Sequence, residues 1–164
     1  MSTQLKNLSD FSHTDVPPAA PYHFGIVVAE WNAGITNALY QGAYESLLEH
    51  GALTQNIFTY SVPGSFELVS GADILLKNRK LDAVICLGCV IQGETRHFDF
   101  ICNAVANGIA NVALKYSKPV IFGVLTTDNQ QQADDRAGGK HGNKGVEAAV
   151  TAIKMAYLAE TLNS

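Results

Sequence analysis

The sequence contains no long apolar run: no segment approaches the ~20 consecutive apolar residues that a membrane-spanning helix requires. Its N-terminal residues also lack the apolar core of a secretion signal. Only three cysteines are present, an odd and small number that does not make a disulfide framework. We therefore expect a cytoplasmic protein that does not bind membranes.

A surplus of positive charge is missing too. The chain has 11 lysines and arginines against 15 aspartates and glutamates, which gives a net charge of −4. Such a chain has no general attraction for nucleic acid, so no nucleic-acid partner is expected and any anion site must be local. What is present, 164 residues with 47% hydrophobic content, is typical of one globular domain.

Two nucleotide-binding signatures are absent as well. The sequence has no G-x-x-x-x-G-K-[ST] and no G-x-G-x-x-G after a strand, which disfavours nucleoside triphosphates and dinucleotides as ligands. Cys86 and Cys89 form a C-x-x-C pair, a spacing found in zinc and redox sites. They fall within a predicted strand, where residues three apart point to opposite faces, and no second ligand pair follows. Buried thiols are the favoured interpretation, and no metal site is expected.

Strand-like apolar runs alternate with helix-like patterns along the chain. We predict strands over residues 24–31, 56–62, 83–91 and 119–127. We predict helices over residues 35–47, 65–79, 98–116 and 146–157, with Gly51 closing the first and Ser65 as N-cap of the second. Four β-α units in series predict an α/β fold: a three-layer α-β-α sandwich, flavodoxin-like, whose four-stranded parallel sheet carries helices on both faces.

A polar leader precedes this pattern. Pro17, Pro18 and Pro21 restrict it to extended conformations. We expect residues 1–21 to form an extended arm, either loose or added as a strand to a neighbouring subunit's sheet, and residues 22–164 to form the single domain.

The segment from Gly88 to His97 is the most informative. An apolar strand breaks at a glycine and meets a hydroxyl, an arginine and a histidine directly before a periodic helix. Open α/β sheets bind ligands at the carboxyl ends of their strands, and helix amino termini attract anions. The segment therefore predicts an anion site.

Residues after the other strands meet at the same edge of the predicted sheet. Trp31 and Phe66 offer flat surfaces for a planar ring, while Asn32, Ser65 and Glu67 offer hydrogen bonds suited to hydroxyl groups. The edge therefore combines a ring-binding surface with polar groups.

Two basic residues have competing interpretations. A histidine such as His97 can give and take protons in general acid–base chemistry. A histidine at a helix start is commonly a solvated surface group, but its place in this cluster favours a site. Arg136 either binds an anion in a bidentate way or is a surface arginine paired with Asp134 or Asp135.

Five motifs follow one another between Phe24 and Leu158: F-G-I-V-V-x-x-W-N, V-P-G-S-F-E, L-G-x-V-I-x-G-E-T-x-H-F-D, P-V-I-F-G-V-L-T-T and R-A-G-G-K-H-G-N-K-G. In order and spacing they resemble the 6,7-dimethyl-8-ribityllumazine synthase family of riboflavin biosynthesis. The resemblance implies condensation of two small molecules, 5-amino-6-ribitylamino-uracil and 3,4-dihydroxy-2-butanone 4-phosphate, to the lumazine, phosphate and water. It implies no metal and no cofactor.

The resemblance also implies a role for each matching residue. His97 matches the proton shuttle, and Glu94, Thr95 and Arg136 match the phosphate-binding residues. The positions that match the ribitylamino-uracil site are Trp31, Asn32, Ser65, Phe66, Glu67, Cys89, Val90, Ile91, Phe122 and Lys144, with Phe122 contributed by the adjacent subunit.

Several of these positions depart from the family pattern. Trp31 stands where phenylalanine is commoner, which preserves stacking, and Cys89 stands where threonine is frequent. Gln92 and Glu94 replace a frequent arginine and a frequent small residue. A carboxylate near a phosphate is unfavourable, so we expect a backbone N–H to bind the phosphate there while Glu94 faces solvent.

In the family, the site lies between adjacent subunits of a homopentamer. The turn over residues 138–145 has no insertion and resembles the branch that forms an icosahedral 60-mer, which makes riboflavin synthase a candidate partner. A shell without catalysis and a flavin-binding module stay open as alternatives. Residues 30–36 lack a flavodoxin-type phosphate loop, and the presence of Glu67, His97 and Arg136 together favours an active enzyme.

Overall fold

A four-stranded parallel sheet forms the centre of the molecule. The computed structural model describes residues 16–163. Its sheet contains β1 (Phe24–Ala29), β2 (Ile57–Val62), β3 (Ala83–Ile91) and β4 (Val120–Thr127). The strand order is β2-β1-β3-β4, and every pairing in it is parallel, which confirms the predicted sheet.

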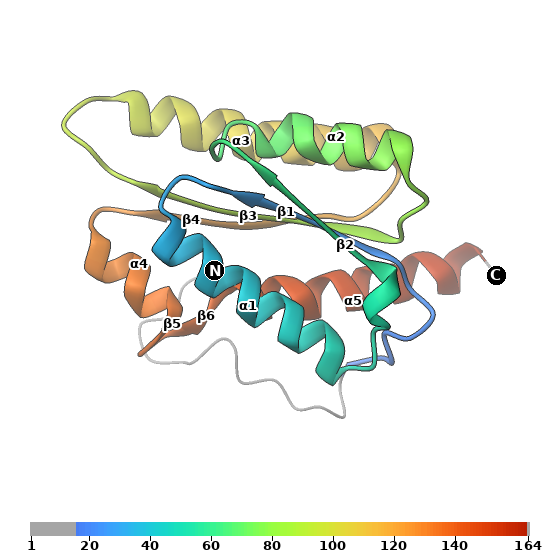
Figure 1. The fold of residues 1–164 in the computed structure, drawn as a ribbon. Helices are drawn as coiled ribbons and strands as arrows, with labels where there is room; N and C mark the ends of the chain where they lie inside the picture. Colours follow the sequence, from blue (N-terminus) through green and yellow to red (C-terminus); the bar gives the residue numbers. More distant parts are fainter. Residues whose placement is uncertain (1–15, 164) are drawn as a thin grey trace.

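Helices cover both faces of this sheet, so the predicted three-layer sandwich is confirmed (Figure 1). One face carries α2 (Leu68–Asn78) and α3 (His97–Tyr116). The other face carries α1 (Ala33–Glu49), the short α4 (Gln130–Arg136) and α5 (Lys144–Asn163). A short helical turn, η2 (Thr54–Asn56), precedes β2, and β5 (Ala137–Gly139) pairs with β6 (Gly142–Asn143) in a small hairpin. None of the described helices is both long and apolar enough to cross a membrane.

The apolar strands supply two separate cores. Ile26 and Ile85 pack under α1 and α5, whereas Val27 and Val84 pack under α2 and α3. Because side chains alternate along a strand, a strand buried on both faces must be apolar throughout. This explains the unbroken hydrophobic runs in the sequence.

The two cysteines of the C-x-x-C pair lie in different cores, as predicted. Cys86 faces α2 and α3, and Cys89 faces the opposite layer. Burial raises the pKa of the Cys86 thiol to about 12. Burial and, to a lesser extent, the charge of Asp134 raise the pKa of Cys89 to about 11. Among the described residues, no three His, Cys, Asp or Glu side chains gather as a metal site would require.

Of the two helix ends that the sequence predicted, the C-terminal end of α1 is confirmed and the N-terminal end of α2 is wrong. Gly51 has a φ of +92°, and α1 is closed by hydrogen bonds from the N–H of Gly51 to the Leu48 carbonyl and from the N–H of Ala52 to the Leu47 carbonyl. The prediction of Ser65 as N-cap is wrong, because α2 begins at Leu68. The chain forms a turn first, in which the Ser65 carbonyl accepts the Leu68 N–H at 3.2 Å.

The short elements α4, β5 and β6 were not predicted. In α4 only Ala133 and Asp135 are buried, so no apolar stripe marks the helix. Its signal is an N-cap: the Asn129 side chain accepts the N–H of Gln132 at 3.0 Å.

The described part of the predicted arm lies against its own chain. Val16 and Ala19 belong to the core beneath α1 and α5, and the Ala19 N–H donates to the His50 carbonyl at 2.8 Å. Residues 1–15 lie outside the described residues, so the arm boundary at residue 21 stays a prediction.

Candidate active site

A cavity of about 560 Å³ lies at the carboxyl ends of β1, β2 and β3, beside the start of α3. This is the edge at which parallel α/β sheets bind ligands. The residues that line it are Trp31, Asn32, Gly64, Ser65, Phe66, Glu67, Cys89, Val90, Ile91, His97 and Ile101. The cavity therefore brings together nine of the predicted site residues, all except Glu94, Thr95, Phe122, Arg136 and Lys144.

A strained asparagine fixes the junction between β1 and α1. Asn32 has a left-handed backbone (φ 60°), a conformation that asparagine adopts more readily than most residues. Its side-chain Nδ2 donates to the Cys89 carbonyl at 2.9 Å, which ties the junction to the end of β3. The preceding Trp31 leaves its side chain 73% exposed at the mouth of the cavity. Asn32 thus holds the aromatic ring beside the end of β3.

The turn from β2 to α2 packs tightly on β3 because residue 88 is glycine. A Cβ on Gly88 would lie 2.7 Å from Ser65 Oγ and 2.9 Å from Leu68 Cδ1. The absent side chain leaves room for Ser65 beside the cavity, which Glu67 also lines, while Phe66 projects outward and is 54% exposed. The turn therefore presents one hydroxyl, one carboxylate and one aromatic ring side by side.

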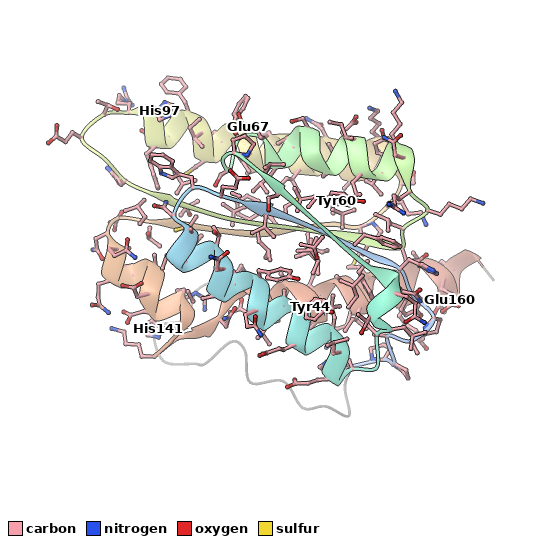
Figure 2. All side chains as sticks on the ribbon, viewed as in Figure 1. Tyr44, Tyr60, Glu67, His97, His141 and Glu160 are labelled. Carbon is pink, nitrogen blue, oxygen red and sulfur yellow. The ribbon has the colours of Figure 1, made fainter. Side chains whose placement is uncertain are left out.

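The third wall is the beginning of α3. His97 is the first residue of the helix, one residue earlier than predicted, and its N–H lies 3.4 Å from Thr95 Oγ1. Figure 2 shows His97 on the same side of the sheet as Glu67. Ile101, one turn further along α3, also lines the cavity. The sequence analysis did not include Ile101 among the site residues, so its place in the cavity was missed.

The five remaining candidates lie elsewhere in the chain. Glu94 and Thr95 belong to the fully exposed loop over residues 92–96. Phe122 lies on the edge strand β4, packed against the core beneath α2 and α3. Arg136 and Lys144 belong to α4 and α5 in the opposite layer. No residue of α4 or α5 lines the cavity of its own chain.

Arg136 forms an ion pair that the sequence did not reveal. Its Nη2 lies 3.0 Å from Glu147 Oε1 and donates to Oε2 at 3.2 Å. Its Nη1 donates to the His141 carbonyl at 3.0 Å. Neither Asp134 nor Asp135 is its partner, so that interpretation is wrong.

Glu147 is the functional candidate that the sequence analysis missed. The residue is 8% exposed and also accepts a hydrogen bond from Lys144 Nζ at 3.3 Å. The available signal was its position three residues after Lys144 in the first turn of a helix. Its carboxylate holds two cations that the family resemblance had assigned to substrate binding.

A neighbouring ion pair has a structural role. Lys140, in the turn between β5 and β6, has its Nζ 3.0 Å from Oδ2 of Asp135 in α4. The hydrogen bond from Lys140 holds the pKa of Asp135 below its usual value. Because Asp135 pairs with Lys140, it is not the partner of Arg136, which pairs with Glu147 instead.

The chain carries two chemically different surfaces. The cavity combines aromatic rings, a carboxylate, a histidine and the end of a strand, which can hold a planar polar heterocycle with hydroxyl groups. The cluster around Arg136 presents guanidinium and ammonium donors, which can hold a phosphate.

Comparisons with known proteins identify the family of the chain. The family model of 6,7-dimethyl-8-ribityllumazine synthase matches residues 21–160. The chain is 64% identical to the 6,7-dimethyl-8-ribityllumazine synthase of Cytophaga hutchinsonii over 162 residues, which covers 99% of this chain and 100% of the relative. It is 54% identical to the enzyme of that name from Parabacteroides distasonis, over 94% of this chain and 97% of the relative. For the Flavobacterium johnsoniae enzyme of the same name, the identity is 53%, over 96% of this chain and 83% of the relative. The chain therefore belongs to the 6,7-dimethyl-8-ribityllumazine synthase family.

Proposed function

We propose that this chain condenses 5-amino-6-ribitylamino-uracil with 3,4-dihydroxy-2-butanone 4-phosphate to give 6,7-dimethyl-8-ribityllumazine, phosphate and two waters. The observation that carries the proposal is the cavity at the carboxyl edge of the sheet, where Trp31, Phe66, Glu67 and His97 converge. Family membership over nearly the whole chain supports it.

The ribitylamino-uracil fits the cavity by its two kinds of surface. Its ring stacks on the exposed face of Trp31, and the backbone of residues 89–91 offers peptide groups to the ring edge. Ser65 and Glu67 bind hydroxyl groups of the ribityl chain, and Phe66 covers it. Such a site recognises shape and hydrogen bonds without a metal.

The reaction then proceeds in three steps. The 5-amino group attacks the butanone carbonyl, forms a C–N bond and releases water, which gives an imine. Loss of a proton from C3 and of phosphate from C4 then gives an enol, which tautomerises to a ketone at C3 and a methyl group at C4. The ribityl-bearing nitrogen finally closes the ring on the second carbonyl with loss of another water. His97 gives and takes the protons of these steps.

Phosphate departure needs positive charge close to the leaving group. Arg136 uses two of its five N–H donors on Glu147 and His141, so the remaining donors can bind phosphate oxygens. Thr95, the backbone at Glu94 and the amino end of α3 add hydrogen bonds on the other side. We infer that these groups bind the phosphate and stabilise the charge that develops on it.

Because Phe122, Arg136 and Lys144 do not line the cavity of their own chain, we infer that they complete the cavity of a neighbouring subunit. The exposed aromatic side chains of Trp31, Phe66 and Phe100 support such a neighbour. We propose a homopentamer, assembled further into an icosahedral 60-mer that offers riboflavin synthase a partner surface.

The direct test is to incubate the assembled protein with both substrates and to follow the absorbance of the lumazine. The expected result is product formation well above the rate of the uncatalysed mixture. Binding of flavin or lumazine without turnover would instead favour a carrier on the same scaffold, and the proposed function would be wrong.

A further inference from the structure

A second cavity, of about 540 Å³, lies at the opposite edge of the sheet from the proposed active site. Three of its lining residues lie just before strands: His23 and Asp82 directly precede β1 and β3, and Lys118 lies two residues before β4. The ends of α2 and α3 supply the rest, including Arg79 and Lys80. The strands separate this cavity from Trp31 and His97.

Positive charge is in excess in this cavity. Arg79, Lys80 and Lys118 face a single carboxylate, that of Asp82, although the whole chain has a net charge of −4. Asp82 already accepts the backbone N–H of His23 at 2.8 Å. Its other oxygen forms a long ion pair with Lys118, whose Nζ lies 3.8 Å away, beyond hydrogen-bond distance. Within residues 16–163, Lys80 has no ion-pair partner. The donors of the two lysines are therefore available.

Arg79 is held in place by neutral groups. Its guanidinium carbon lies 4.6 Å from the centre of the Phe58 ring, and Nη2 donates to the Tyr60 hydroxyl at 3.0 Å. An aromatic face and a phenol orient the guanidinium but do not cancel its charge. The cavity thus contains one oriented arginine and two lysines without strong carboxylate partners.

Stabilisation of helix ends does not account for these cations. Lys77 and Lys115 already occupy the last turns of α2 and α3, where a cation favours the helix dipole. Two of the last four carbonyls of α3, those of Ala113 and Leu114, accept backbone N–H groups of Lys118 and Ser117. The side chains of Lys80 and Lys118 lie past both helices and are not needed there.

We propose that this cavity is a second phosphate-binding site, distinct from the proposed active site and independent of the proposed reaction. Arginine and lysine donors bind phosphate oxygens, and Leu76, Leu81 and Tyr116 form an apolar wall beside them. The phosphate is either inorganic phosphate or the phosphate group of a small ester, whose organic part contacts the wall.

The test is a titration of the assembled protein with inorganic phosphate and, separately, with glycerol 3-phosphate, by isothermal titration calorimetry. All variants also carry Arg136→Ala, so that phosphate binding at the proposed active site contributes as little as possible to the measured heat. The double variant Lys80→Gln, Lys118→Gln is compared with Lys154→Gln, which removes an exposed lysine of α5 outside both cavities.

We expect the double variant to bind phosphate at least about tenfold more weakly than the Lys154→Gln control. With Arg136 intact, the double variant should retain full lumazine formation. Tighter binding of glycerol 3-phosphate than of inorganic phosphate would identify an ester as the ligand. Equal affinity in the double variant and the control, or no phosphate binding in the Arg136→Ala background, would overturn the second site and leave the proposed reaction untouched.

Discussion

His97 begins α3 at the mouth of the cavity, where it can exchange protons with the reacting groups. We expect His97→Gln to lower kcat by about 10²–10⁴-fold. Measurable activity should remain, since holding two reactants together is worth about 7–11 kcal/mol, the larger contribution. Steady-state kinetics would test this, with His23→Gln as a matched variant outside this cavity. Complete loss of activity with intact substrate binding would show that His97 does more than move protons.

Arg136 and Glu147 form the ion pair that we assign to phosphate binding. We expect Arg136→Ala to raise KM for the butanone phosphate by about 10–100-fold, because a charge-assisted hydrogen bond contributes about 1.5–3 kcal/mol. The KM for the ribitylamino-uracil should change little.

Removing Arg136 leaves the buried Glu147 carboxylate with Lys144 as its one cationic partner among the described residues. The folding of the Arg136→Ala variant must therefore be checked. Arg136→Lys keeps the positive charge and should recover part of the affinity. An unchanged KM for the butanone phosphate in a folded Arg136→Ala variant would contradict the assignment.

Among the elements, β3 depends on a glycine for its contact with the β2–α2 turn. We expect Gly88→Ala to destabilise the protein by about 1–3 kcal/mol, because the new methyl group would overlap Ser65 and Leu68. Gly34→Ala is the matched variant: a Cβ there meets nothing within 4 Å, so stability should be unchanged or higher. Urea unfolding of both variants would measure the difference, and equal midpoints would refute the close contact.

The segment before β1 is joined to α5 by a buried tyrosine. The Tyr22 hydroxyl donates to Glu160 Oε2 at 2.6 Å, and burial followed by that carboxylate raises the Tyr22 pKa from 10.0 to about 12. The folded pKa is higher than the unfolded one, so the stabilisation is complete below pH 10 and is lost as the pH rises toward about 12.

Tyr22→Phe should therefore remove part of the fall in unfolding free energy above pH 10. Unfolding in urea at neutral pH and at alkaline pH would measure this. Tyr44→Phe serves as the matched variant and should keep the wild-type pH dependence. The same alkaline fall in Tyr22→Phe and wild type would show that Tyr22 does not cause it.

The sequence predicted the strands and the long helices because each contributes a periodic apolar pattern. It failed where polar side chains determine the local structure. In α4 the cap at Asn129 replaces an apolar stripe. The Ser65 side chain packs against Gly88 of β3, three residues before α2 begins. These effects depend on contacts between segments that are distant in sequence.

The candidate site shows the same division. Residues that follow strands could be placed at one edge, because parallel topology brings those ends together. The partner of Arg136 could not be predicted, because Glu147 lies in another helix. Asp135 is nearer in sequence but pairs with Lys140. The closeness of Asp134 and Asp135 in sequence suggested the wrong carboxylates as partners of Arg136.

At the scale of the whole molecule, the cavity and the Arg136 cluster lie in different layers of one chain. Figure 2 shows His97 and His141 on opposite sides of the sheet. If each active site takes one part from each of two subunits, two variants that each bind one substrate poorly should complement each other when both substrates are kept at low concentration. We expect rings assembled from a mixture of Glu67→Ala and Arg136→Ala chains to recover about a quarter of wild-type activity, since half of the cavities and half of the arginines are intact.

Activity of the refolded mixture would measure this, and native mass spectrometry of the same sample would count the chains per particle. A mixture no more active than the two variants alone would contradict a shared site. A pentamer or decamer without larger particles would contradict the 60-mer.

The separation of the cavity from the Arg136 cluster also bears on why such a chain would close on itself. If two copies share each site as proposed, each interface between them completes one catalytic centre. In an open row of copies, the cavity at one end has no neighbouring arginine and the arginine at the other end has no neighbouring cavity. In a closed ring every cavity has a neighbouring arginine. The number of complete centres therefore equals the number of chains only when the ring is closed.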